Sequence, residues 1–256
     1  MDQLHGTTHR TMAYINLYGV LGALEELCRL DGEAQALIAG KAFSIGFQVA
    51  GGPCAALCFD QGACTLTDGA AGCDIRLAFA SPEKFNGMID GTATPIPTKG
   101  FTRLKLLTKT FVPLTDILTR YLRASEADLR DPVFFEKSTT LMFYTIAAAL
   151  SQIGNHDKIG RASASYIPDG TVCLRIQGGP AAAIGVRGHI LRTVKRPPEH
   201  PAATMEFGSM AIARDLFEGK RNSLACIGVG EVRVEGMMLM LDNLNRILDR
   251  VGLYLA

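Results

Sequence analysis

Apolar side chains at helical spacing begin each half of the chain. In the first half they recur at spacings that mostly fit one face of a helix, and a second set does much the same in the second half. The two sets are Met12, Ile15, Leu17, Leu21, Leu24 and Leu27, and then Phe134, Leu141, Phe143, Ile146, Leu150 and Ile153. Each half is therefore predicted to open with a helix that buries one face.

Short apolar segments between turn residues predict strands after each helix. In the first half they cover 42–49, 54–59 and 63–67, and in the second half 162–167, 171–176 and 181–186, which favours an antiparallel meander in each. A fourth strand, 73–79 or 203–207, leads into a short helix. Ser81 or Ser209 is its expected N-cap, and Gly91 or Gly219 closes it.

An amphipathic helix is predicted at the end of each half. The second half reaches it through an alternating strand at 223–229, a brief strand at 232–234 and Gly236. Its apolar face carries Met237, Leu241, Leu244, Leu248, Val251 and Leu255. The corresponding face of the first half carries Leu104, Leu107, Phe111, Leu114, Leu118 and Tyr121, and Pro113 is expected to kink or restart that helix.

The two halves are copies of one unit. Gly-Gly-Pro at 51–53 recurs at 178–180, a shift of 178 − 51 = 127 positions, and the short-helix segments recur with Gly91 at Gly219, a shift of 219 − 91 = 128. Collinear matches at nearly one offset indicate an internal duplication. The boundary is placed in the charged stretch 125–131, which gives domains 1–124 and 132–256, with a proline opening the helix of the second.

Charge and composition exclude several partners. Lys and Arg total 26 against 25 Asp and Glu, so no net field attracts nucleic acid or an anionic membrane, and the 48% hydrophobic content suits packed domains. The apolar runs are too short or too interrupted to cross a bilayer. The N-terminal residues lack the pattern of a secretory signal, and seven cysteines is an odd number. We expect a cytoplasmic protein with reduced thiols.

Candidate chemistry is sparse. Cys54, Cys58, Cys64 and Cys73 are the densest group of thiols, but they lack paired Cys-x-x-Cys spacing, so small buried hydrophobic residues are the favoured interpretation over a metal site. The glycine-rich stretches fit neither a phosphate-binding loop nor a dinucleotide fingerprint, and no Gly-x-Ser-x-Gly occurs. The basic segment 188–198 favours a solvated turn over an exposed loop that meets lipid headgroups or a partner protein. No catalytic residue, metal or cofactor is predicted.

The order of elements resembles the sterol carrier protein 2 family. The segments that carry the likeness are 205–209, 216–220 and 231–236 in the second half, and 73–79 with 85–91 in the first. The resemblance implies an α+β fold in which a mostly antiparallel, twisted sheet is covered by helices around an apolar tunnel for a lipid. The first half departs from the pattern at 92–100, where two prolines disfavour a regular strand pair except at an edge, and it is the more divergent domain.

The expected function is the binding and transfer, without catalysis, of a lipid-like molecule such as a fatty acyl chain, an acyl thioester or a sterol-like ligand. The terminal helix commonly lines the tunnel in this family, and methionine adapts to ligands of varied shape. Candidate ligand-binding residues are Met237, Met240, Leu241, Leu244, Leu248, Val251, Phe217, Phe207, Leu104, Leu107, Phe111 and Leu114. The alternative is an interaction module that forms a homodimer through the methionine-rich helix, with Leu244 on the contact face. An enzyme acting on a hydrophobic substrate ranks last.

Overall fold

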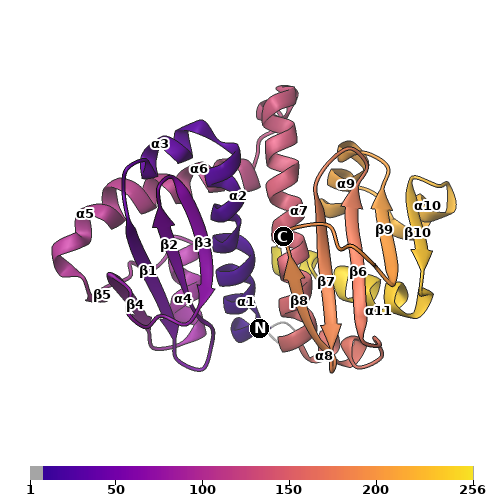
Figure 1. Ribbon diagram of the computed structural model, residues 1–256, viewed down its shortest axis with the longest axis horizontal. Coiled ribbons are helices and arrows are strands. Elements are labelled where there is room, and N and C mark those ends of the chain that lie inside the picture. The colour runs from indigo at the N-terminus through magenta and orange to yellow at the C-terminus, as the bar shows by residue number, and fades with distance from the viewer. Residues whose placement is uncertain (1–7, 256) are drawn as a thin grey trace. The chain divides into compact units, whose positions relative to one another are not determined.

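The computed structural model describes residues 8–255 and divides into two compact units. The N-terminal unit is His9–Leu141; the C-terminal unit contains Thr8 and residues 142–255. Each has one five-stranded sheet with helices packed against it (Figure 1), in the order β3-β2-β1-β4-β5 or β10-β9-β6-β7-β8. The predicted α+β fold with two repeats is confirmed.

The N-terminal unit begins with a long helical segment whose geometry changes along its length. It runs as α1 (His9–Tyr14), the π-helical η1 (Ile15–Val20), the 3-10 turn η2 (Leu21–Ala23) and α2 (Leu24–Leu30). The following elements are α3 (Gly32–Ile38), β1 (Phe43–Val49), β2 (Cys54–Asp60), β3 (Ala63–Asp68), β4 (Ile75–Phe79), α4 (Pro82–Ile89), β5 (Pro97–Lys99), η3 (Phe101–Arg103), α5 (Leu104–Leu106), η4 (Leu107–Phe111), α6 (Val112–Leu122) and η5 (Asp128–Arg130).

The C-terminal unit repeats this order and adds one helix. Its elements are α7 (Pro132–His156), which starts in the N-terminal unit, then α8 (Lys158–Ala164), β6 (Gly170–Ile176), β7 (Ala181–Arg187), β8 (Ile190–Val194), β9 (Ala203–Phe207), α9 (Met210–Phe217), α10 (Ser223–Gly228), β10 (Val232–Gly236), α11 (Met238–Leu248) and α12 (Gly252–Leu255). The added helix is α10, which lies between α9 and β10.

Strand register reproduces the sequence repeat. Ile45 pairs with Leu57 in β1 and β2, and Val172 pairs with Ile184 in β6 and β7, so both strands shift by 127 positions. The central strands β1 and β6 also pair in parallel with β4 and β9, while the other pairings are antiparallel. Each Gly-Gly-Pro forms a hairpin turn whose first glycine has positive φ, +69° at Gly51 and +71° at Gly178. The repeat thus specifies matching hairpins.

Two of the three predicted strands of the second half are present, 171–176 within β6 and 181–186 within β7, and the other is wrong. The segment 162–167 is not a strand, because it contains the end of α8, whose first turn is capped by the side chain of Asp157. The third strand is instead β8, which lies in the basic segment 188–198 where a solvated turn is predicted. Gly188 and His189 both have positive φ, as do Gln61 and Gly62 in the first repeat, and this conformation suits a tight two-residue hairpin.

The predicted strand at 223–229 is also wrong. Residues Ser223–Gly228 form α10, and the side chain of Asn222 accepts a hydrogen bond from the backbone of Ala225, which caps the helix. A short apolar run fits a strand or a buried helix equally well, and here the Asn222 cap favours the helix. The strand at 232–234 is present within β10.

The start of α7 packs on the N-terminal unit. The ring of Phe134 stacks on Tyr121 with centroids 4.6 Å apart, and the hydroxyl of Ser138 donates to the carbonyl of Tyr121 at 2.6 Å. The compact units therefore divide between Leu141 and Met142, inside α7, whereas the predicted boundary at 125–131 precedes this helix. The helix that opens the second repeat also completes the core of the first.

The helix at the end of the first half is interrupted near Pro113, as expected. The π-helical η4 precedes α6, in which Pro113 occupies the first turn. The proline-rich segment before it supplies only the three-residue edge strand β5, which pairs with β4 through an irregular register. Both outcomes follow from the missing backbone N–H of proline.

Candidate functional site

The strand before α11 ends at a glycine, Gly236, that no other residue could replace without displacing the backbone. Gly236 has φ +88°, and a Cβ there would collide with the carbonyl oxygen of Ala202. Met237 donates its backbone N–H to that same carbonyl at 3.0 Å. Gly100 has the same φ, and its Cβ would lie 2.5 Å from the carbonyl oxygen of Asp74. The close approach fixes where the terminal helical segment leaves the sheet in both units.

Around the start of α11, exposed apolar side chains are followed directly by buried ones. Met237, Met238 and Leu239 are 45%, 57% and 55% exposed. The next two residues, Met240 and Leu241, are buried. Exposed and buried apolar side chains are thus consecutive at this end of the helix, and an apolar molecule could contact both.

The buried face of α11 lies against the sheet and against α7 and α8. The methyl carbon of Met240 is 3.3 Å from the position that a Cβ would occupy on Gly170, at the start of β6. Further along, Ile247 and Leu191 approach Gly154 of α7 closely. Because glycine has no side chain, α11 can lie close to both elements at these points.

The predicted ligand-binding residues of the C-terminal unit fall into a buried and a partly exposed group. Met240, Leu241, Leu244, Val251 and Phe207 are buried, while Met237, Leu248 and Phe217 are partly or more fully exposed. Phe217 packs beside one other member of this set, since its ring centroid lies 5.3 Å from that of Phe207. It also lies 6.4 Å from the ring centroid of Phe143 on α7. Phe143 was not among the predicted site residues.

The four predicted residues of the N-terminal unit do not form one surface. Leu107, Phe111 and Leu114 belong to its core, and the ring of Phe111 lies 5.9 Å from that of Phe47. Leu104 is 42% exposed. The structure therefore places three of these residues among core side chains.

Leu244 cannot be a contact residue of a homodimer in this fold. Its side chain is 1% exposed and faces the interior of its own unit. A charged residue at this position would disrupt packing rather than report on association. The prediction of a homodimer itself stays a prediction, and exposed residues such as Met238 would be the ones to test it.

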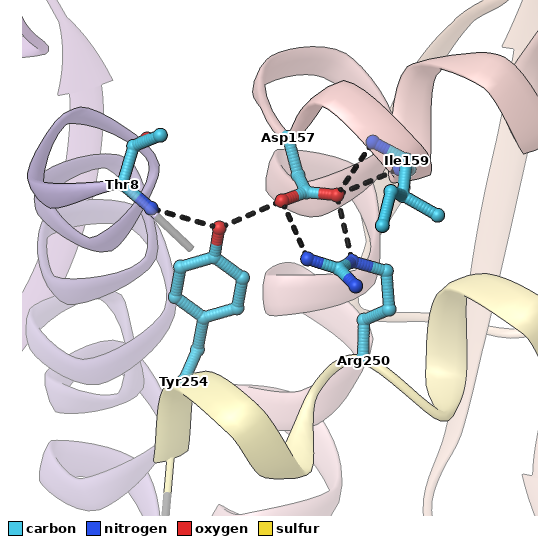
Figure 2. Close-up of polar contacts among 6 residues, drawn as sticks. Thr8, Asp157, Ile159, Arg250 and Tyr254 are labelled. Atoms are coloured by element: carbon cyan, nitrogen blue, oxygen red, sulfur yellow. Dashed lines mark hydrogen bonds and ion pairs between the residues drawn. The ribbon is translucent and has the colours of Figure 1, made fainter. Parts of the chain in front are cut away.

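The buried carboxylate of Asp157, at the start of α8, bonds to two side chains that follow α11 (Figure 2). Asp157 is 0% exposed; its Oδ1 accepts the backbone N–H groups of Ile159 and Gly160 at 3.0 and 2.7 Å. Arg250 contacts both of its oxygens, Nε at 2.7 Å and Nη2 at 2.9 Å. The hydroxyl of Tyr254 donates to Oδ2 at 2.8 Å and accepts the N–H of Thr8. We call Asp157, Arg250 and Tyr254 the Asp157 cluster.

The N-terminal unit has a matching cluster. Asp31 caps α3 through the N–H groups of Glu33 and Ala34, as Asp157 caps α8. Its Oδ2 accepts the hydroxyl of Tyr121 at 2.7 Å and pairs with Lys137 at 3.3 Å. An aspartate cap, a tyrosine from the terminal helical segment and a cation are thus common to both units. Sequence reasoning missed both clusters, although an aspartate before a helix is a recognisable capping signal.

Acid is expected to weaken the Asp157 cluster. Burial raises the pKa of Asp157, but hydrogen bonds from Arg250, the Gly160 N–H and Tyr254 outweigh it and leave the pKa below its usual value. Because the folded pKa is the lower one, the stabilisation is complete above the unfolded pKa of about 3.9 and is lost as the pH falls through the folded pKa.

We therefore expect the Asp157→Asn variant to lose less free energy of unfolding than the parent protein between about pH 5 and about pH 2. Urea unfolding followed by circular dichroism at a series of pH values would measure this. Asp31→Asn is the matched variant in the other unit. Burial raises the pKa of Asp31, but hydrogen bonds from the Ala34 N–H, Tyr121 and Lys137 outweigh it and leave the pKa below its usual value. Equal pH slopes for the parent and Asp157→Asn would contradict the assignment.

The thiols form no metal centre in the part of the chain that the structure describes. All seven cysteines are free, and among residues 8–255 no group of three or more His, Cys, Asp or Glu side chains is placed to hold a metal ion. Cys64 and Cys73 are buried, and burial is the main cause that raises the pKa of Cys73. Within the same residues, no helix combines the length and apolarity needed to cross a membrane.

Comparison with known proteins gives structural likenesses only. No family model matches the sequence, and no curated protein matches it. Solved structures with a similar fold include the sterol carrier protein domain 2 of Helicoverpa armigera, at 16% identity, 43% of this chain, 88% of that chain and a TM-score of 0.36. The ubiquinone synthesis protein UbiJ-SCP2 is also similar, at 13% identity over 42% of this chain and 88% of that chain, with a TM-score of 0.34.

Sterol carrier protein 2 of Yarrowia lipolytica, in its apo form, is also similar, at 16% identity, 41% of this chain, 92% of that chain and a TM-score of 0.31. Each of these likenesses covers less than half of this chain but most of the smaller protein. These three solved structures carry sterol carrier protein 2 names, and this chain is similar in fold to each of them over less than half of its length.

Proposed function

We propose that this protein binds a lipid-like apolar molecule, such as a fatty acyl chain, an acyl thioester or a sterol-like compound, and carries it without catalysing a reaction. The observation that carries the proposal is the first part of α11. Three exposed apolar side chains, Met237, Met238 and Leu239, are followed directly by the buried Met240 and Leu241. This continuity supports a path by which an apolar ligand would pass from solvent to the proposed tunnel between helices and sheet.

Two further features support a carrier. The helix is bounded at its start by the close approach of Gly236 and near its end by the Asp157 cluster, so its position is defined while its first turn stays open to solvent. Methionine side chains adapt to ligands of different shape because they are unbranched and polarizable. A pocket lined in this way would accept a class of lipids rather than one compound. The free cysteines fit a reducing compartment, which supports a cytoplasmic location.

Native mass spectrometry of gently purified protein tests the proposal directly. A co-purifying apolar molecule in stoichiometric amount, identified after extraction, is the expected result, together with an increase in melting temperature on addition of a long-chain fatty acid. Protein that is ligand-free and unaffected by long-chain fatty acids, acyl thioesters and sterols would refute it.

Leu239→Ser is expected to weaken fatty acid binding about fivefold, since covering the exposed half of a leucine contributes about 1 kcal/mol. Titration with the fluorescent fatty acid cis-parinaric acid would measure this change. Leu253→Ser is the matched control, because Leu253 is a similarly exposed leucine on α12, at 47%. If both variants bind the fatty acid with the affinity of the parent protein, the ligand does not contact the first part of α11.

A further inference from the structure

The inward-facing residues of the two sheets can be compared position by position, because strand pairing aligns the units. The pair Phe43 and Phe59 of β1 and β2 occupies the register of Gly170 and Val186 in β6 and β7. Phe47 corresponds to Leu174 in the same way. In the short helices, which start after Ser81 and Ser209, Phe85 corresponds to Ala213.

Phenylalanine rings fill the interior of the N-terminal unit. Phe43 stacks on Phe59 with centroids 4.6 Å apart, and Phe85 contacts Phe47 and Phe79 edge to face at 6.2 and 5.1 Å. None of these five rings is more than 8% exposed. They come from strands and the short helix, so this interior is occupied by side chains held on the sheet itself.

The C-terminal unit has smaller side chains at four of these positions. Gly170, Leu174, Val186 and Ala213 replace the four phenylalanines at 43, 47, 59 and 85, while the fifth ring is kept, as Phe207. Changes to a larger side chain include Cys64 to Leu191, Val49 to Ile176 and Ile89 to Phe217. The second interior has therefore lost four rings from its sheet and short helix and gained one.

Side chains of other elements occupy part of that space. Met240 of α11 lies beside Gly170, where the first unit has the ring of Phe43. Phe217, at the end of α9, is only partly buried. Unlike a ring on a central strand, a methionine on the terminal helix can change its rotamers to admit another molecule. The C-terminal interior thus has a flexible side chain where the N-terminal unit has a ring held on a central strand.

We infer that the ligand is bound by the C-terminal unit alone, between β6, α9 and α11, in the space that phenylalanine rings fill in the N-terminal unit. The inference rests on the proposed function and goes beyond it, because it assigns the binding site to one of two units with the same fold. It also assigns the N-terminal unit a role that requires no ligand.

Ring substitutions in the full-length chain test the assignment. Ala213→Phe restores the ring of Phe85 at the equivalent position, and Leu174→Phe restores that of Phe47. Ala211→Phe is the matched control, because it places the same ring at an exposed position of the same helix. Binding of cis-parinaric acid and its stoichiometry would be measured for each variant, with the melting temperature recorded to show that it is folded.

The parent protein is expected to bind one equivalent per chain. We expect Ala213→Phe or Leu174→Phe to weaken binding at least about tenfold, whereas Ala211→Phe does not, since a buried ring removes the volume that the ligand needs. Leu174→Phe is the smaller change and serves if Ala213→Phe does not fold. Binding of two equivalents per chain by the parent protein would overturn the assignment and leave the proposed function intact. Unchanged binding in folded Ala213→Phe or Leu174→Phe protein would do the same. A parent protein that binds no apolar probe would refute both.

Discussion

Replacing Arg250 by methionine is expected to lower the free energy of unfolding of the C-terminal unit by about 3 kcal/mol. The substitution keeps an aliphatic side chain of similar length but removes the only cation that contacts both oxygens of Asp157 among the described residues. Asp157 is completely buried, so its charge would be left with Tyr254 and two backbone N–H groups. Removing one partner of a buried ion pair is costly because the other keeps its desolvation penalty.

Hydrogen exchange of peptides from β6 and β9 is the suitable measurement, because a chain with two units can unfold in more than one step. Arg246→Met is the matched control. Arg246 forms an ion pair with Asp242 on the solvent side of α11, where both side chains are 64% exposed, and such pairs contribute about 0–1 kcal/mol. If Arg250→Met changes stability no more than Arg246→Met does, the capping bonds and Tyr254 satisfy Asp157 without the arginine.

The parts of the fold that the sequence predicted correctly depend on local signals. The Gly-Gly-Pro turns, the alternating strands beside them and the short helix after β4 or β9 can each be read within about ten residues. Duplication doubles the evidence, because Gly51 and Gly178 must both adopt the same left-handed conformation. The errors arose where local signals compete, as at 223–229, where a helix cap at Asn222 overrides an apolar alternation.

The Asp157 cluster could not be predicted because its members are far apart in the chain. Arg250 and Tyr254 follow Asp157 by 93 and 97 positions, and nothing in one sequence connects them. Ligand-binding residues are difficult for another reason. An apolar helix face predicts that Met240 or Phe111 turns inward, but a core and a cavity wall have the same pattern. The ring substitutions proposed for Ala213 and Leu174 would separate the two cases.

Replacing Phe85 by alanine is expected to destabilise the N-terminal unit by about 3–5 kcal/mol. Phe85 is completely buried on α4 and contacts the rings of Phe47 and Phe79. The loss combines the transfer free energy of the ring with the cost of the space it leaves, because the surrounding strands can collapse only in part. Hydrogen exchange in peptides of β1 and β4 would report it. Lys84→Ala, at an exposed position of the same helix, is expected to change stability by less than about 0.5 kcal/mol.

The same variant connects stability with the division of roles between the units. If a ring on α4 takes the place of a ligand, the space left by Phe85→Ala is apolar and should bind a small apolar molecule such as benzene, which would restore part of the lost stability. The C-terminal unit already carries alanine at the equivalent position, Ala213, and tolerates it in a completely buried environment. A loss below about 1 kcal/mol in Phe85→Ala would show that the N-terminal core closes around the missing ring. In that case the difference between phenylalanine and alanine could not decide which unit binds a ligand.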